Sequence, residues 1–275
     1  RTTDHPATSQ ARGVQQYWTD PRDCQPNPLQ RVYDASKSLL HRLFPATCLL
    51  CLDPGQLPAL DLCCGCEDDF PQNHPACAGC AMPVVSAGEI CMNCRRQRRV
   101  FDAAFAPYRY EFPLVQLIHR FKYGGQIAIG RILGTLLARR LAERGKPCVD
   151  AIVPVPLHAA REAQRGYNQA REMAMFAAQL LCIPMEDRLV RRSRATVEQT
   201  ALPAGARRRN LRGAFEVRAA SVPLSVAIVD DVLTTGATAE ALALALRRAG
   251  CRHVEVWAAA RATGQPVTAS GSCSG

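Results

Sequence analysis

The sequence predicts an α/β protein in which helices flank a parallel sheet and a small zinc-binding domain lies at the N-terminal side. Three observations indicate this. Strand-like and helix-like patterns alternate from residue 100 onward, four Cys-x-x-Cys pairs precede residue 95, and an apolar segment ending in two aspartates leads into a glycine turn. Such alternation is typical of parallel sheets, and repeated cysteine pairs are typical of zinc sites.

Composition sets the outer limits. The chain has 275 residues, of which 48% are hydrophobic, so one large or two modest domains can bury a sizeable core. No apolar run is long enough to span a membrane, and the N-terminal segment lacks the apolar core of a signal peptide. We therefore expect a cytoplasmic protein without a membrane span. Its 34 basic residues exceed its 24 acidic ones, which suits phosphate-rich partners.

The first predicted segment, residues 1–44, is an N-terminal extension. Residues 1–28 are polar and contain several prolines, a composition typical of poorly ordered chain. Residues 29–44 match one amphipathic helix, which Pro45 would end.

The second segment, residues 45–99, is predicted to bind zinc. Eight thiolates suffice for two tetrahedral sites with no open position, so the zinc is expected to be structural. The predicted ligands are Cys48, Cys51, Cys63, Cys66, Cys77, Cys80, Cys91 and Cys94. We favour sharing between the first and second pairs and between the third and fourth, with a cross-braced arrangement as the alternative. Cys64 could replace Cys63, and His74 is expected to be an ordinary loop residue.

The third segment, residues 100–262, is predicted to form the sheet, and residues 263–275 a disordered tail. An arginine-rich stretch at 95–99 precedes the sheet and is either a solvated hinge or a phosphate-facing patch. Alternating segments follow at 101–110, 113–121 and 127–144. We then expect a strand at 151–155, a helix at 168–182, a strand with an apolar run at 225–229 that ends in Asp230 and Asp231, a helix at 239–248 and a last strand at 253–260.

The most informative motif joins the strand at 225–229 to the helix at 239–248. Asp230 and Asp231 follow the strand and are placed to accept hydrogen bonds from the hydroxyls of a sugar. The hydroxyls of the turn and the free N–H groups of the first helical turn can surround its phosphate. The motif thus predicts a ribose-5-phosphate pocket made by Val232, Leu233, Thr234, Thr235, Gly236, Ala237 and Thr238. The alternative is a simple helix cap.

A second element follows the strand at 151–155. Pro154, Val155 and Pro156 form a rigid segment, and the donors after it, Arg161 and Arg165 among them, suit a diphosphate. The alternative is an ordinary strand-to-helix loop that Asn168 caps.

Residues 188–212 contain eight arginines and one glutamate. Repulsion between like charges should keep this segment mobile until an anion binds, which suits a lid over a diphosphate. Candidate lid residues are Arg191, Arg194 and Arg207. The competing interpretation is a salt-sensitive contact with nucleic acid.

Residues 44–261 resemble the ComF family of competence-associated, phosphoribosyltransferase-like proteins. The matching segments, in order, are residues 44–51, 118–125, 153–157, 165–170, 207–215 and the loop at 230–238. Because six segments match in order, the resemblance is specific.

The resemblance implies a type I phosphoribosyltransferase-like fold that binds phosphoribosyl diphosphate (PRPP) with Mg²⁺. If the protein is an enzyme, Asp230 and Asp231 would act at the ribose while diphosphate leaves the anomeric carbon. Lys122 would contact PRPP or the acceptor, and His119 would either do the same or face the core. The family is tied to DNA uptake, which implies single-stranded DNA and uptake-machinery proteins as partners. The alternative is a non-catalytic module that binds PRPP or DNA.

Overall fold

A parallel sheet forms the centre of the computed structural model, which describes residues 46–56, 60–145, 147–193, 211, 213–219 and 221–263. All of these residues belong to the unit Phe44–Gly275. The N-terminal extension and helix predicted for 1–44 lie outside the described residues, as does the predicted tail beyond residue 263.

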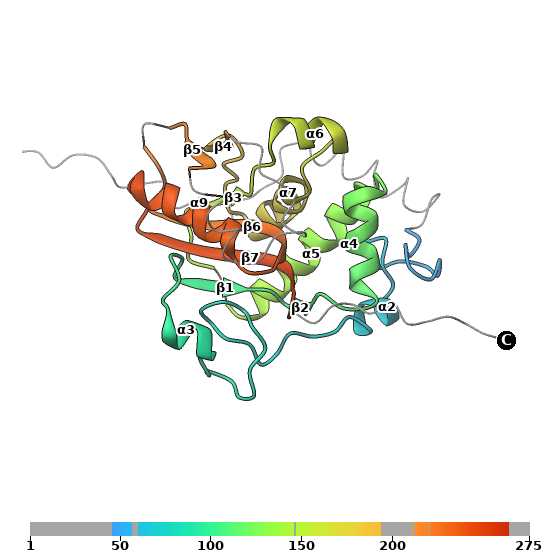
Figure 1. Cartoon of the computed structure of the whole chain (residues 1–275). Helices are drawn as coiled ribbons and strands as arrows, with labels where there is room; N and C mark the ends of the chain where they lie inside the picture. Colours follow the sequence, from blue (N-terminus) through green and yellow to red (C-terminus); the bar gives the residue numbers. More distant parts are fainter. Residues whose placement is uncertain are drawn as a thin grey trace, which may run out of the picture. The chain divides into compact units, whose positions relative to one another are not determined.

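The central sheet has the strand order β1-β7-β6-β3, and β2 also pairs with β7 (Figure 1). The strands are β1 (Ala103–Phe105), β2 (Tyr108–Arg109), β3 (Ala151–Pro154), β6 (Ser225–Leu233) and β7 (His253–Arg261). Every pairing is parallel. The middle strands β6 and β7 are apolar on both faces, as parallel strands covered by helices require.

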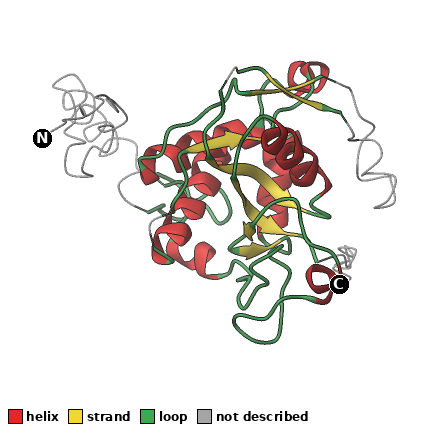
Figure 2. Ribbon diagram, turned by 90° about the vertical axis from the view of Figure 1, so that its left-hand side faces the viewer, coloured by secondary structure: helices red, strands yellow, loops and turns green. Residues whose placement is uncertain are grey.

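Helices cover both faces of the sheet (Figure 2). The helices α4 (Leu114–Tyr123), α5 (Ala128–Glu143) and α7 (Gln169–Leu181) bury their apolar sides with Trp257 and Val229. On the other face, α9 (Ala237–Arg248) buries Leu242 and Leu246 against strand residues such as Val256. The predicted fold class, a parallel sheet flanked by helices beside a cysteine-rich unit, is confirmed.

Close packing of α5 on α7 depends on Gly134. A Cβ atom at this position would lie 2.4 Å from the carbonyl oxygen of Met173. Any larger residue would therefore push the two helices apart and disturb the core beneath β6 and β7.

Three elements near the site, one helix and two strands, were not predicted. Helix α6 (Ala159–Arg165) follows β3, with His158 as its N-cap. Strands β4 (Val190–Arg192) and β5 (Phe215–Val217) form an antiparallel pair. The arginine-rich stretch was expected to be mobile from residue 188. Near its start, β4 instead pairs with β5, so the expectation is wrong for β4. Candidate lid residues Arg194 and Arg207 lie outside the described residues.

The cysteine-rich unit contains little regular structure besides α2 (Cys64–Asp68) and α3 (Met92–Arg96). Its apolar side chains join the core of the sheet domain, and Phe70 contacts Tyr108 edge-on at 5.5 Å between ring centroids. The hinge interpretation of residues 95–99 expects a solvated side chain at Arg99. Its Nη1 instead donates to Glu240 of α9 at 2.9 Å. The unit thus packs on the sheet domain through shared core and hydrogen bonds.

Candidate functional site

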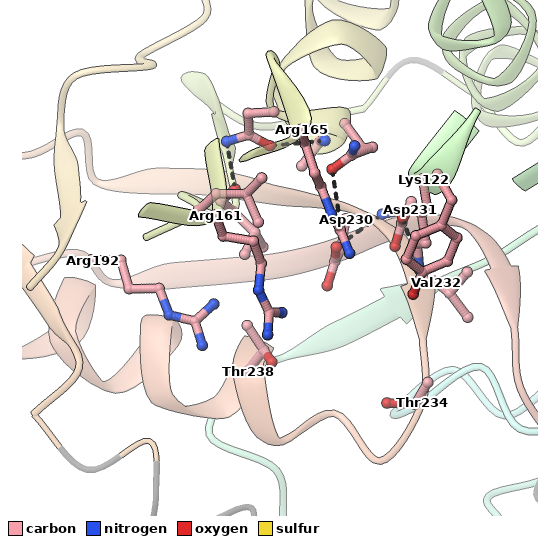
Figure 3. A pocket seen from close by; sticks show the side chains of 15 residues that line it. Lys122, Arg161, Arg165, Arg192, Asp230, Asp231, Val232, Thr234 and Thr238 are labelled. Carbon is pink, nitrogen blue, oxygen red and sulfur yellow. Dashed lines mark hydrogen bonds and ion pairs between the residues drawn. The ribbon is translucent and has the colours of Figure 1, made fainter. Parts of the chain in front are cut away.

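A pocket of about 320 Å³ opens where β3 and β6 end, between α4, α6, α7, β4 and the start of α9 (Figure 3). This is the edge of the sheet where ligands bind in open α/β folds. Fifteen residues line the pocket, and among them are two groups whose charged members have opposite signs. The lining residues are Lys122, Tyr123, Val155, Leu157, Arg161, Arg165, Asn168, Gln169, Ala170, Arg192, Asp230, Asp231, Val232, Thr234 and Thr238.

The first group, which we call the carboxylate wall, consists of Asp230, Asp231, Thr234 and Thr238. Strand β6 continues to Leu233, so it extends two residues beyond the aspartates in which it was predicted to end. Pairing with β7 at Asp230, and again at Val232 and Leu233, carries the strand past both carboxylates.

The two aspartates have different environments. Lys122 Nζ lies 2.9 Å from Asp231 Oδ2, so Asp231 forms an ion pair in which both side chains are largely buried. Asp230 Oδ1 accepts only the backbone N–H of Asp231, at 2.9 Å, among the hydrogen bonds described for its side chain. Asp230 therefore keeps acceptor capacity for a ligand.

Burial and then the nearby charge of Asp231 raise the pKa of Asp230 to about 7, although Lys122 and Arg192 act in the opposite direction. Burial acts to lower the pKa of Lys122, but Asp231, Asp230 and Tyr110 together outweigh burial and hold this pKa above its usual value. Near neutral pH the Asp230 carboxyl group therefore gains or loses a proton beside the ion pair of Lys122 and Asp231. Hydroxyl donors or a divalent cation would favour the ionised form of Asp230.

The turn between β6 and α9 contributes backbone N–H groups and threonine hydroxyls to this wall. Gly236 adopts φ +80 as the N-cap of α9 and provides no side-chain cap. Thr235 Oγ1 instead accepts from the N–H of Ala237 at 3.3 Å. The N–H groups of a first helical turn point along the helix axis toward the space before the helix. With Thr234 and Thr238 beside them in the pocket, they form a site suited to a phosphate.

The second group, the arginine wall, consists of Arg161 and Arg165 of α6 and Arg192 of β4. Arg165 donates to Gln169 Oε1 at 3.2 Å and stacks over Tyr123 at 5.2 Å from the ring centroid. Burial, followed by the charge of Arg161, holds the pKa of Arg192 below its usual value. Cations that crowd in this way favour an anionic ligand.

Eight of the predicted PRPP-site residues line the pocket, and the other predicted contacts do not. The eight are Asp230, Asp231, Val232, Thr234, Thr238, Val155, Arg165 and Lys122. Pro154 and Pro156 line a neighbouring cavity of about 270 Å³, because successive residues of extended chain point to opposite sides. Leu233 and Ala237 are buried in the core. Thr235 and Gly236 shape the turn.

Arg191 also departs from its predicted place at the PRPP site. Its Nη2 lies 2.9 Å from Glu216 Oε2 in an exposed ion pair, and its side chain lines the neighbouring cavity. Arg191 and Arg192 are neighbours in β4 and point to opposite sides of the strand. Arg192 lines both cavities and is the one of the two that reaches the pocket.

Sequence reasoning missed two lining residues. Tyr123 received no role, and Arg192 was counted only as part of the arginine-rich stretch. The spacing of Arg161 and Arg165, four residues apart, was a signal that both lie on one side of a helix. His119 is exposed and stacks on Tyr123 at 4.8 Å, so the interpretation that it faces the core is wrong.

The eight cysteines form two groups that match the favoured pairing. One contains Cys48, Cys51, Cys63 and Cys66, the first tetrad; the other contains Cys77, Cys80, Cys91 and Cys94, the second tetrad. Cys64 and His74 belong to neither. Within each tetrad the four Sγ atoms lie within 4.8 Å of one another. Ligands about 2.3 Å from a tetrahedral zinc ion are about 3.8 Å apart, so both tetrads fit zinc.

Sequence comparisons agree with these features. The family profile described as a double zinc ribbon domain matches residues 39–95. Competence protein F of Haemophilus influenzae is 34% identical over 228 residues, which cover 80% of this chain and 98% of that protein. The DNA utilization protein YhgH of Escherichia coli K12 is 33% identical, with 79% and 97% covered.

Two further comparisons are more distant. Competence protein ComFC of Streptococcus pneumoniae is 24% identical, with 73% of this chain and 87% of that protein covered. The solved structure of TT1426 from Thermus thermophilus is 22% identical and superposes with a TM-score of 0.29 over 50% of this chain and 86% of that one. No helix among the described residues is both long and apolar enough to cross a membrane.

The chain is 34% identical to competence protein F and 33% identical to the DNA utilization protein YhgH, and the matches cover nearly the full length of both relatives. The chain therefore belongs to their family.

Proposed function

We propose that the pocket binds PRPP and that the protein transfers its 5-phosphoribosyl group to an acceptor with release of diphosphate. The observation that carries the proposal is the pairing of two walls in one pocket: carboxylates beside a helix N-terminus, and arginines opposite them. PRPP has the matching sequence of groups, a 5-phosphate, a ribose with two vicinal hydroxyls, and a diphosphate.

In this proposal each wall has one task. Asp230 and Asp231 accept hydrogen bonds from the ribose hydroxyls, and the start of α9 with Thr234 and Thr238 binds the 5-phosphate. Arg161 and Arg165 bind the diphosphate, which leaves the anomeric carbon as the acceptor forms a bond to it. Carboxylates on the ribose side stabilise the positive charge that develops on the sugar.

Two metals accompany the proposal. Mg²⁺ bound with PRPP would neutralise diphosphate charge. Structural Zn²⁺ in the first and second tetrads would hold the cysteine-rich unit, which has few apolar residues of its own. The names of the relatives concern competence and DNA utilization, and we propose that this chain works in the same process, with single-stranded DNA and DNA-uptake proteins as partners.

The decisive experiment separates binding from turnover. The full chain is titrated with PRPP and Mg²⁺ in a calorimeter, and diphosphate release is measured with a panel of bases, amines and oligonucleotides. We expect saturable binding and acceptor-dependent release, both lost in Asp230→Asn/Asp231→Asn. Binding without release from any acceptor would replace the transferase with a PRPP-sensing module, and no binding would overturn the assignment.

A further inference from the structure

Arg261 joins the second tetrad to the phosphate-binding turn. It ends β7, and only 4% of its surface is exposed. Its Nε donates to the carbonyl oxygen of Cys80 at 3.0 Å. Its Nη1 donates to the carbonyl of Leu233 at 2.7 Å, to that of Thr234, and to that of Ala262 at 2.5 Å. One buried guanidinium thus binds a cysteine of the tetrad and the two residues that begin the turn.

Arg99 forms a second connection. Its Nη1 contacts the carbonyl oxygen of Thr235 at 3.4 Å and forms an ion pair with Glu240 in the first turn of α9 at 2.9 Å. The same guanidinium also lies next to a Cβ placed on Gly236, at 3.8 Å. Arg99 follows Cys94 by five residues, so it extends from the chain that completes the second tetrad. Two arginines therefore contact consecutive carbonyl groups of the turn.

We propose that Arg261 and Arg99 are positioning residues through which metal binding at the second tetrad sets the conformation of the phosphate-binding turn. The role in phosphate affinity rests on the proposed function. Physically, a metal ion fixes the backbone of the Cys77–Cys80 segment, and with it the carbonyl that Arg261 contacts. Zinc with four thiolates also carries two negative charges, which attract both guanidinium groups.

The first tetrad has no such connection among the described residues. Its segment contacts helices instead: Arg120 of α4 donates to the carbonyl of Leu49 at 2.9 Å, and Arg131 of α5 pairs with Asp61 at 2.5 Å. Both helices lie on the face of the sheet opposite α9. The first tetrad therefore provides an internal control, because its loss should disturb the α4–α5 side and spare the turn.

The test compares Arg261→Gln with Arg131→Gln in the full chain. Both remove one charged connection between the cysteine-rich unit and the sheet domain. Hydrogen exchange of residues 233–240 is measured without ligand, together with zinc content and affinities for ribose 5-phosphate and for inorganic diphosphate. For Arg261→Gln we expect about tenfold faster exchange of this segment, unchanged zinc, about tenfold weaker ribose 5-phosphate binding and unchanged diphosphate binding. For Arg131→Gln we expect none of these changes.

A comparison of two variants that each remove one predicted zinc ligand completes the test. Cys80→Ser should accelerate exchange of residues 233–240, whereas Cys51→Ser should not. If Cys80→Ser fails to fold, Arg261→Gln alone decides. Unchanged exchange of the turn in Arg261→Gln, or equal acceleration in Arg131→Gln, would overturn the proposal. Because exchange is measured without ligand, the coupling can be confirmed even if PRPP does not bind.

Discussion

The carboxylate wall and the arginine wall face each other across one pocket but are built differently. The carboxylate wall comes from β6 in the middle of the sheet and from the helix that follows it directly. The arginine wall comes from α6 and β4, which lie outside the central sheet. The first is fixed by the pairing of β6 with β7, which continues past the aspartates, while the second depends on short peripheral elements.

This difference suggests a division of labour. A rigid wall suits the sugar, whose hydroxyls need acceptors at fixed positions, and an outlying wall of arginines suits a leaving group that must depart. If the walls bind different parts of PRPP, then ribose 5-phosphate and inorganic diphosphate probe them separately. The predictions below concern changes to one wall at a time and the resulting affinities for these ligands.

The largest effect is expected for the carboxylate wall. Asp230→Asn/Asp231→Asn removes two charged acceptors, and hydrogen bonds to charged groups contribute about 1.5–3 kcal/mol each. PRPP and ribose 5-phosphate should bind more than about 100-fold more weakly, since about 1.4 kcal/mol is a factor of ten. Diphosphate should bind at least as well as to the wild type. Calorimetry gives all three constants, with Asp187→Asn, a half-buried aspartate outside the pocket, as control.

For the arginine wall we expect the opposite pattern, in which diphosphate affinity falls and ribose 5-phosphate affinity is kept. Arg161→Gln/Arg165→Gln removes two partly exposed cations, each contributing about 1 kcal/mol after solvent screening. Diphosphate and PRPP affinity should fall roughly 30-fold, and ribose 5-phosphate affinity should hardly change. Arg171→Gln, which breaks an exposed pair with Asp187, controls for the loss of surface charge. An equal loss of affinity for diphosphate and for ribose 5-phosphate would contradict the division of labour between the two walls.

The pKa of Asp230 adds a pH dependence to the carboxylate wall. Its pKa of about 7 lies above that of an ordinary carboxyl, so the ionised form becomes more populated as pH rises through 7. Ribose hydroxyls bind that form, and affinity scales with its population. Ribose 5-phosphate affinity should therefore rise roughly tenfold from pH 6 to pH 8. Phosphate titration contributes too, but it persists in Asp230→Asn, so the difference between wild type and variant isolates the carboxyl.

The smallest effect is expected at the hydroxyls of the turn. Thr234→Val removes one neutral donor from an exposed position, and such a hydrogen bond contributes about 1 kcal/mol. Ribose 5-phosphate affinity should fall about fivefold, while diphosphate affinity stays constant. Thr234→Ser keeps the hydroxyl and should restore binding. Failure of serine to restore it would assign the effect to packing of the turn.

Sequence patterns predicted the central elements well because burial on both faces leaves a clear signal. The apolar run before Asp230 and the alanine- and leucine-rich segment after Thr238 correspond to β6 and α9, although β6 continues to Leu233 and α9 begins at Ala237. The grouping of the cysteines followed their order in the chain, since short loops bring neighbouring pairs together.

Peripheral features could not be predicted in the same way. Helix α6 has no buried residue, so no apolar periodicity indicates it. Strand β4 is three residues long, and its partner β5 is distant in sequence, which hid the opposite orientations of Arg191 and Arg192. The contacts of Arg261 with Cys80 and Leu233 join segments far apart in the chain and leave no local pattern. The assignment of PRPP contacts to individual residues stays a prediction.

A crystal structure of the full chain with PRPP and Mg²⁺ tests the central claim most directly. The account predicts the 5-phosphate at the start of α9 beside Thr234 and Thr238, the ribose hydroxyls on Asp230 and Asp231, and the diphosphate against Arg161 and Arg165. An empty pocket, or PRPP bound with its diphosphate at the start of α9, would contradict it.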